Sequence, residues 1–305
     1  RTRKATVAKE TKIAEKASNS FIPEEYWSLD ADFTVPGEKK PLKAKFYGTD
    51  KKKMLLHNEE EVKEILAKLE NAEYQVCDVK KGERVKKAPL PFTTSTLQQE
   101  ASKVLNFSTQ KTMRIAQQLY EGVDIKGNGT VGLITYLRTD STRISEEADQ
   151  AARTYVSENY GENYVAEGNN EAKKGTKKIQ DAHEAIRPSD ISRTPVLVKE
   201  SLSRDQFRLY QLIWKRFTAS RMANAVYETT QVKIQAGEYH FHVSASRLSF
   251  DGFMSVYVDD TAEKEENNVL LKGSGTDTVL NLKEFHPEQH FTQPPAHYTE
   301  ASLVK

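Results

Sequence analysis

The chain has 305 residues, of which 37% are hydrophobic and 29% are charged, with 45 Lys and Arg against 44 Asp and Glu for a formal net charge of +1. This profile predicts a polar globular protein of about two domains, and no apolar run approaches the length that would span a bilayer. Residues 1–9 are mostly basic and polar with no apolar segment behind them, so no secretory signal is predicted and a cytoplasmic protein is expected.

The charge balance bears on nucleic-acid binding. Dedicated nucleic-acid binders are often strongly basic, and this chain as a whole is not. This overall balance is compatible with a local basic groove, because lysines cluster in residues 39–53 and 80–87. The single cysteine, Cys77, cannot form an internal disulfide or a cysteine-based zinc cluster, and it is expected to be a small buried hydrophobic residue.

The N-terminal part of the chain has patterns typical of β-strands. Apolar and polar residues alternate from Trp27 to Val35 and again from Leu42 to Phe46, which predicts two half-buried antiparallel strands joined by a turn at Pro36-Gly37. A short helix is predicted around residues 62–69, where apolar residues share one stripe.

Residues 95–222 have mostly helical patterns. Capping signals predict helix starts at Ser95 with Gln98, at Ser145 and at Ser203 with Gln206, and a helix stop at Gly122. The last helix of this block has one apolar stripe, expected to be core, made of Phe207, Tyr210, Ile213, Trp214 and Phe217.

Strand patterns return after Ala225, at residues 226–236 and 239–245 and less regularly at 276–285. The predicted fold class is therefore α+β, with several domains: an antiparallel β domain into which an all-α domain is inserted through two strands. We assign residues 21–94 and 223–290 to the β domain and residues 95–222 to the inserted domain.

One segment inside the helical block, residues 132–140, does not have a helical pattern. If it is extended, Ile134, Tyr136 and Arg138 lie on one face. A phenol is a poor nucleophile at neutral pH because it ionises only near pH 10, so a neighbouring cation would matter. The planar guanidinium of Arg138 can bind two phosphate oxygens and could supply that charge. Taken alone, the pattern is also compatible with a structural tyrosine.

Residues 132–145 read Gly-Leu-Ile-Thr-Tyr-Leu-Arg-Thr-Asp-Ser-Thr-Arg-Ile-Ser, and this run resembles the active-site signature of the bacterial type IA DNA topoisomerases. Three more stretches resemble the same family: residues 91–99, residues 182–188 and residues 291–305. The resemblance extends from about Phe21 to the C-terminus. Residues 1–20 match poorly, and His297 stands where the family usually has Arg.

The resemblance implies a fold and a mechanism. In this family the β domain forms an arch, the inserted α domain carries the tyrosine, and residues 291–305 would begin a base domain. Tyr136 would attack single-stranded DNA to give a 5′-phosphotyrosine, and the other strand would pass before religation. This isomerase would relax negatively supercoiled DNA without ATP. Arg138 would hold the scissile phosphate and His183 would assist. The resemblance also implies DNA contacts, from Gln98, Thr135, Thr139, Asp140, Ser141, Thr142 and Arg187.

The resemblance further implies Mg²⁺ in the intact enzyme, with its ligands in a Toprim domain. Nothing resembling that domain is present, and no metal ligands are predicted in this chain. The expected partners are therefore DNA and the Toprim and base domains of the same polypeptide, with no membrane. This chain alone is expected to be inactive in relaxation.

Other interpretations remain open. A tyrosine recombinase or type IB enzyme would use similar Arg and His residues, but its tyrosine would lie C-terminal to them and its DNA linkage would be 3′. A topoisomerase III-like member usually has Pro where Leu137 stands. A non-catalytic single-stranded DNA-binding module would not need Tyr136. His240 and His242 lie on one face of a predicted strand, a spacing that can chelate metal, but without a visible third ligand a solvated sheet face is expected.

Overall fold

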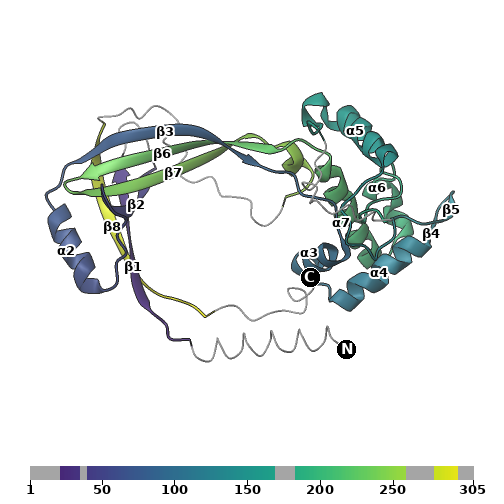
Figure 1. Cartoon of the computed structure of the whole chain (residues 1–305), viewed down its shortest axis with the longest axis horizontal. Coiled ribbons are helices and arrows are strands. Elements are labelled where there is room, and N and C mark those ends of the chain that lie inside the picture. Colours follow the sequence, from purple (N-terminus) through teal and green to yellow (C-terminus); the bar gives the residue numbers. More distant parts are fainter. Residues whose placement is uncertain (1–20, 35–39, 169–182, 259–277, 295–305) are drawn as a thin grey trace, which may run out of the picture. The chain divides into compact units, whose positions relative to one another are not determined.

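The structure, a computed structural model, describes residues 21–34, 40–168, 183–258 and 278–294. The chain divides into two compact units (Figure 1). One unit comprises residues 1–84, 226–249 and 263–296, and the other comprises residues 85–225, 250–262 and 297–305. The predicted combination of a large antiparallel sheet with helices is therefore confirmed. The segments 1–20 and 295–305 lie outside the described residues.

The first unit is built around a closed barrel with strand order β1-β2-β7-β6-β3-β8. Its strands are β1 (Glu25–Thr34), β2 (Leu42–Thr49), β3 (Tyr74–Lys86), β6 (Ala225–Ala236), β7 (Tyr239–Phe250) and β8 (Val279–Phe291). Strand β8 closes the barrel by pairing antiparallel with β1, from Glu25 opposite Phe291 to Thr34 opposite Asn281. The closure removes the open edges that a flat sheet would expose.

The inward-facing side chains of the alternating strands fill the barrel interior. Leu29 and Phe33 of β1 and Leu42 of β2 are buried in one hydrophobic core, as the sequence pattern predicted. Helix α2 (Glu59–Leu69) is capped by Asn58, whose side chain accepts a hydrogen bond from the Glu61 amide at 2.9 Å. The apolar stripe of α2 packs onto the same core.

The second unit is mostly helical. Its helices are α3 (Thr94–Leu105), α4 (Thr109–Glu121), α5 (Glu146–Tyr160), α6 (Pro195–Val198) and α7 (Arg204–Ser220), with short 3₁₀ turns η1 (Glu162–Tyr164), η2 (Lys199–Ser201) and η3 (Gly252–Ser255). The predicted core stripe of α7 is buried, apart from the half-buried Phe207. Two α7 side chains also hold a neighbouring loop: the Tyr210 hydroxyl donates to the Arg193 carbonyl at 2.6 Å, and the Trp214 indole donates to the Ile191 carbonyl at 2.9 Å.

The predicted helix ends at Gly122, Ser145 and Ser203 are confirmed. The predicted start at Ser95 is wrong. Helix α3 is capped instead by Thr93, which has an extended backbone and forms a capping box with Thr96.

Two further expectations need correction. The helical block is not all-α, because β4 (Val123–Ile125) and β5 (Gly129–Val131) form a hairpin between α4 and α5. Gly127 and Gly129 adopt positive φ angles in its turn, which glycine does at little cost. Cys77 is exposed rather than buried, because it occupies an outward position of β3 beside the buried Val76.

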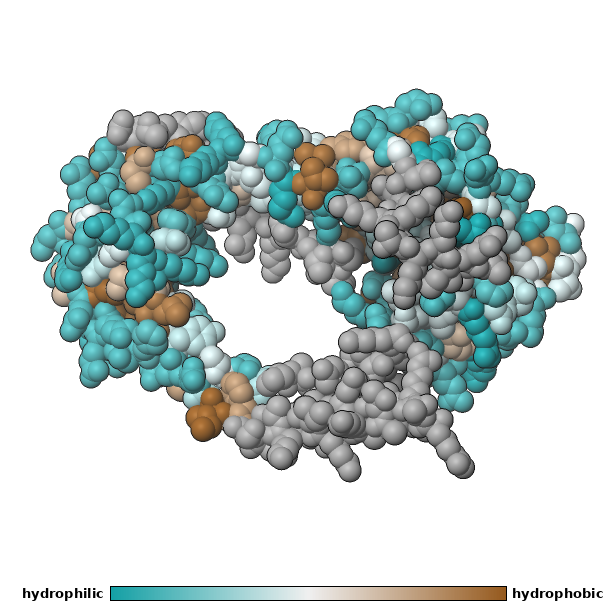
Figure 2. Space-filling view, viewed as in Figure 1, coloured by the Kyte–Doolittle hydropathy of each residue, from teal (hydrophilic) through white to brown (hydrophobic). Residues whose placement is uncertain are grey.

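The surface shown in Figure 2 is mostly hydrophilic on both units, with separate hydrophobic spots. Within the described residues, no helix is long and apolar enough to cross a membrane.

Candidate active site

The segment that carries Tyr136 is extended but is not a regular strand. Ile134 forms an isolated bridge with Pro188, and the rest of the segment has no strand pairing. From Tyr136 onward exposed and buried side chains alternate: Tyr136 and Arg138 are exposed, and Leu137 is only 1% exposed. Ile134 is buried and does not share the exposed face, so that part of the prediction is wrong. Tyr136 and Arg138 do share that face, at neighbouring outward positions.

The start of helix α3 holds this segment. Thr94 donates its backbone N–H to the Thr139 carbonyl at 2.9 Å. Its hydroxyl lies 2.7 Å from the Leu137 carbonyl, to which it donates, and it accepts a hydrogen bond from the Thr139 amide at 2.9 Å. These bonds fix the backbone on the C-terminal side of Tyr136.

The end of helix α4 holds the backbone on the N-terminal side of Tyr136. The Leu133 amide donates to the Leu119 carbonyl at 2.8 Å, and Leu133 is fully buried. A Cβ atom on Gly132 would stand 2.8 Å from the carbonyl oxygen of Tyr120. Only glycine therefore allows the backbone to pass this close to the end of α4.

Residues 183–188 lie alongside the same segment. The Thr135 amide donates to the Arg187 carbonyl at 2.9 Å, and the Thr135 hydroxyl donates to the Ala185 carbonyl, 50 positions later in the sequence, at 2.7 Å. Ile186 donates in turn to the Phe92 carbonyl at 2.8 Å. Three stretches far apart in the sequence, around residues 92, 134 and 186, are thereby joined.

This arrangement brings His183 against Tyr136. Their ring centroids are 5.2 Å apart with an interplanar angle of 38°. The Tyr136 side chain is 37% exposed, so its ring is held by neighbours while part of it remains open to solvent. A phenol can act as a nucleophile when a neighbouring group activates it, and an imidazole or a guanidinium can take or offset charge during such a reaction.

Comparison with known proteins identifies the family of this chain. A sequence model described as DNA topoisomerase matches residues 12–305. The chain belongs to the bacterial type IA DNA topoisomerase family. The solved structure of full-length topoisomerase I from Thermotoga maritima shares 35% sequence identity with it and superposes with a TM-score of 0.78. The match covers 98% of this chain and 46% of the Thermotoga chain, so the chain spans less than half the length of that relative.

The remaining residues proposed for DNA contact in this topoisomerase chain fall into two groups. Asp140 is exposed, and Gln98 and Thr142 are half-buried. Thr139 and Ser141 are buried, and their hydroxyls accept hydrogen bonds from the amides two residues further along, at 3.1 and 3.2 Å. Those two hydroxyls therefore stabilise the bend of the segment.

The guanidinium of Arg187 forms hydrogen bonds with other groups of the same chain. Its Nε and one terminal nitrogen donate to the same Glu184 carboxylate oxygen at 2.9 and 2.6 Å. The other terminal nitrogen donates to the Pro188 carbonyl at 2.9 Å. These contacts fix the loop that carries His183, and they leave only part of the donor capacity of Arg187 for DNA.

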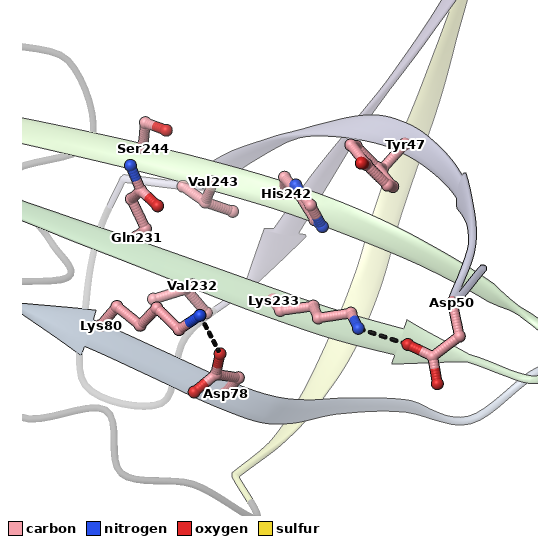
Figure 3. A pocket seen from close by; sticks show the side chains of 10 residues that line it. All are labelled: Tyr47, Asp50, Asp78, Lys80, Gln231, Val232, Lys233, His242, Val243 and Ser244. Carbon is pink, nitrogen blue, oxygen red and sulfur yellow. Dashed lines mark hydrogen bonds and ion pairs between the residues drawn. The ribbon is translucent and has the colours of Figure 1, made fainter. Parts of the chain in front are cut away.

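The histidine pair of β7 belongs to the barrel unit and lies in a different environment from the one expected. His240 is only 3% exposed, and His242 is half-buried and stacked on Tyr47 with a ring distance of 4.0 Å. The expectation of a solvated sheet face is wrong, because His240 is buried and Tyr47 stacks on His242. His242 and Tyr47 line a pocket of about 270 Å³. Figure 3 shows the two side chains beside each other, near the ion pair of Lys233 with Asp50.

Burial lowers the pKa of both His240 and His242, and the charge of Lys233 lowers it further. In the described part of the chain, no group of three or more His, Cys, Asp or Glu residues could hold a metal ion.

Proposed function

We propose that this chain carries the nucleophile of a type IA DNA topoisomerase and that Tyr136 is that nucleophile. One observation supports the proposal most strongly: in a chain of this family, the Tyr136 ring is exposed, contacts His183 and lies two residues from the exposed Arg138. The substrate is single-stranded DNA within negatively supercoiled DNA, in the cytoplasm.

The reaction is a transesterification. The Tyr136 oxygen attacks a backbone phosphorus as its proton leaves, the bond from phosphorus to the 3′ oxygen breaks, and that oxygen departs as a 3′-hydroxyl with a proton. The product is a 5′-phosphotyrosine. Because one phosphodiester replaces another, religation is the reverse reaction and no ATP is required. The passage of the other strand through the gap changes the DNA topology.

Arg138 and His183 assist in this proposal. The guanidinium of Arg138 binds the oxygens of the scissile phosphate and offsets the charge that develops on them. His183, in contact with the Tyr136 ring, forms a hydrogen bond to the phosphate or relays a proton. Mg²⁺, which the family resemblance assigns to a Toprim domain, takes no part in the steps proposed for these residues.

Within the family we propose the topoisomerase I branch rather than topoisomerase III. Leu137 stands where the topoisomerase III branch usually has Pro, and the match to the Thermotoga topoisomerase I supports the same branch. The alternative of a non-catalytic DNA-binding module gives a different result in the experiment below.

The test uses this chain joined to the Toprim and base domains of its polypeptide, with single-stranded oligonucleotides labelled at one end or the other. After denaturation, a 3′ label should remain with the protein and a 5′ label should appear on a shortened free fragment. Tyr136→Phe should give no adduct. Retention of the 5′ label would indicate the 3′ linkage of a type IB enzyme or recombinase, and DNA binding without any adduct would favour the binding module.

A further inference from the structure

A second tyrosine, Tyr120, contacts Tyr136. Their ring centroids are 5.5 Å apart and the ring planes meet at 68°, which is the edge-to-face arrangement that aromatic pairs prefer. With His183 at 5.2 Å, the Tyr136 ring has aromatic neighbours from two separate parts of the chain. Among the described residues, no hydrogen bond to the Tyr136 hydroxyl is observed. Ring contacts, rather than a bond to the reacting oxygen, therefore orient this side chain.

The backbone fixes the position of Tyr120. It lies in the last turn of α4, whose inner face is anchored by the buried Ile115 and Leu119. The helix stops at Gly122, which adopts a φ of +126° and whose amide donates to the Gln118 carbonyl at 3.2 Å. Tyr120 is thus carried by a rigid element with a defined end.

The distance between the two tyrosines is set by the same backbone. The close approach at Gly132 and the bond from the Leu133 amide to the Leu119 carbonyl attach the start of the Tyr136 segment to this turn of α4. The Tyr120 side chain is itself 39% exposed, so it contributes little to the core. Its contact with Tyr136 is the feature that distinguishes it from other surface tyrosines.

We propose that Tyr120 is a positioning residue: its ring holds the Tyr136 ring so that the phenol oxygen points at the scissile phosphate. This inference rests on the proposed function. The side chain acts through its ring and not through its hydroxyl, so phenylalanine should replace it. A displacement of about 1 Å between reacting groups can slow a reaction by about a hundredfold, so the loss of one of two ring contacts should have a measurable effect.

The experiment compares Tyr120→Phe, Tyr120→Leu and Tyr120→Ala in the full-length polypeptide. Single-turnover cleavage of a labelled oligonucleotide is measured at saturating enzyme, and DNA affinity is measured separately. Leucine and alanine should slow cleavage by about tenfold or more at unchanged affinity. Phenylalanine should keep the wild-type rate.

Tyr160→Ala is the matched control. Tyr160, like Tyr120, lies in the last turn of a helix that stops at a glycine, and its ring contacts Tyr164 rather than the candidate site. This variant should cleave at the wild-type rate. Thermal unfolding of every variant shows which of them fold, and the leucine variant preserves the test if the alanine variant does not fold.

Three results would overturn the proposal: wild-type cleavage by the leucine and alanine variants, a loss of DNA affinity with an unchanged rate at saturation, or a phenylalanine variant as slow as alanine. The second result would make Tyr120 a DNA-binding residue, and the third would assign its role to the hydroxyl. Failure of the proposed function has separate signatures: either Tyr136→Phe would still form the adduct, or the wild-type polypeptide would bind DNA and form no adduct.

Discussion

Replacing Thr94 with valine should loosen the segment that carries Tyr136 without removing any group from the exposed face. Valine keeps the size and branching of threonine but has no hydroxyl. The Thr139 amide then loses its acceptor and the Leu137 carbonyl loses its donor. The bond from the Thr94 amide to the Thr139 carbonyl remains.

The magnitude follows from these contacts. The hydroxyl has one proton, so its distances of 2.7 Å to the Leu137 carbonyl and 3.0 Å to the Thr139 carbonyl represent one donated bond. One donated and one accepted bond, at about 0.5–1.5 kcal/mol each, give a local destabilisation of about 1–3 kcal/mol. Local opening should become about 5-fold to about 150-fold more frequent.

The assay is hydrogen exchange of the Thr139 amide in this chain, followed by nuclear magnetic resonance under native conditions. The Thr94→Val variant should show faster exchange at Thr139, and Thr94→Ser, which keeps the hydroxyl, should stay close to wild type. In the full-length polypeptide, the valine variant should also cleave DNA more slowly. Unchanged exchange at Thr139 would refute the assignment of Thr94 as the residue that holds this segment.

Three more predictions concern other parts of the molecule. Arg138→Ala should slow covalent cleavage by about a hundredfold or more while DNA is still bound, because the scissile phosphate loses its charged partner; rapid-quench cleavage assays measure this rate. Gly132→Ala should lower the free energy of unfolding by about 1–3 kcal/mol, because the added Cβ would stand 2.8 Å from a backbone oxygen. Gly82→Ala should leave it unchanged, because the nearest atom to a Cβ added there is 3.5 Å away. Denaturant titration of both variants measures the difference. Folding lowers the pKa of His240 and His242, so the unfolded chain takes up protons before the folded chain does as the pH falls. The free energy of unfolding should therefore decrease as the pH drops below about 6.5, and urea titrations at several pH values measure this decrease. A smaller decrease in a variant with both histidines changed to glutamine would support this origin.

The strands and most helix ends could be predicted because their causes are local. Alternation in β1 and β2 requires only the burial of one face, and the caps at Ser145 and Ser203 satisfy amides within the same helix turn. Closure of the barrel could not be predicted, since β1 and β8 lie at opposite ends of the chain and their register depends on the whole sheet.

The errors arise where tertiary contacts choose between local alternatives. Thr93 and Ser95 can both cap a helix, and the bonds of the intervening Thr94 to the Tyr136 segment accompany a start at Thr93. The period of β7 correctly placed His240 and His242 on one face of the strand, but no local pattern indicates that His240 is buried or that Tyr47 stacks on His242.

For the candidate site, the sequence drew attention to Tyr136 and Arg138 through their spacing, and to His183 only through family resemblance. The supporting residues were not found. Gly132 gave a weak signal as a glycine at the start of an extended segment, whereas Thr94 and Tyr120 gave none, because their roles depend on contacts between distant parts of the chain.

The most direct test of the central claim is to identify the amino acid that becomes joined to DNA. The full-length polypeptide is incubated with a single-stranded oligonucleotide, denatured during cleavage, and digested with protease and nuclease before mass spectrometry. We predict one modified peptide, with a nucleotide attached through its 5′-phosphate to Tyr136. A nucleotide on any other residue, or one attached through a 3′-phosphate, would contradict the assignment of Tyr136 as a type IA nucleophile.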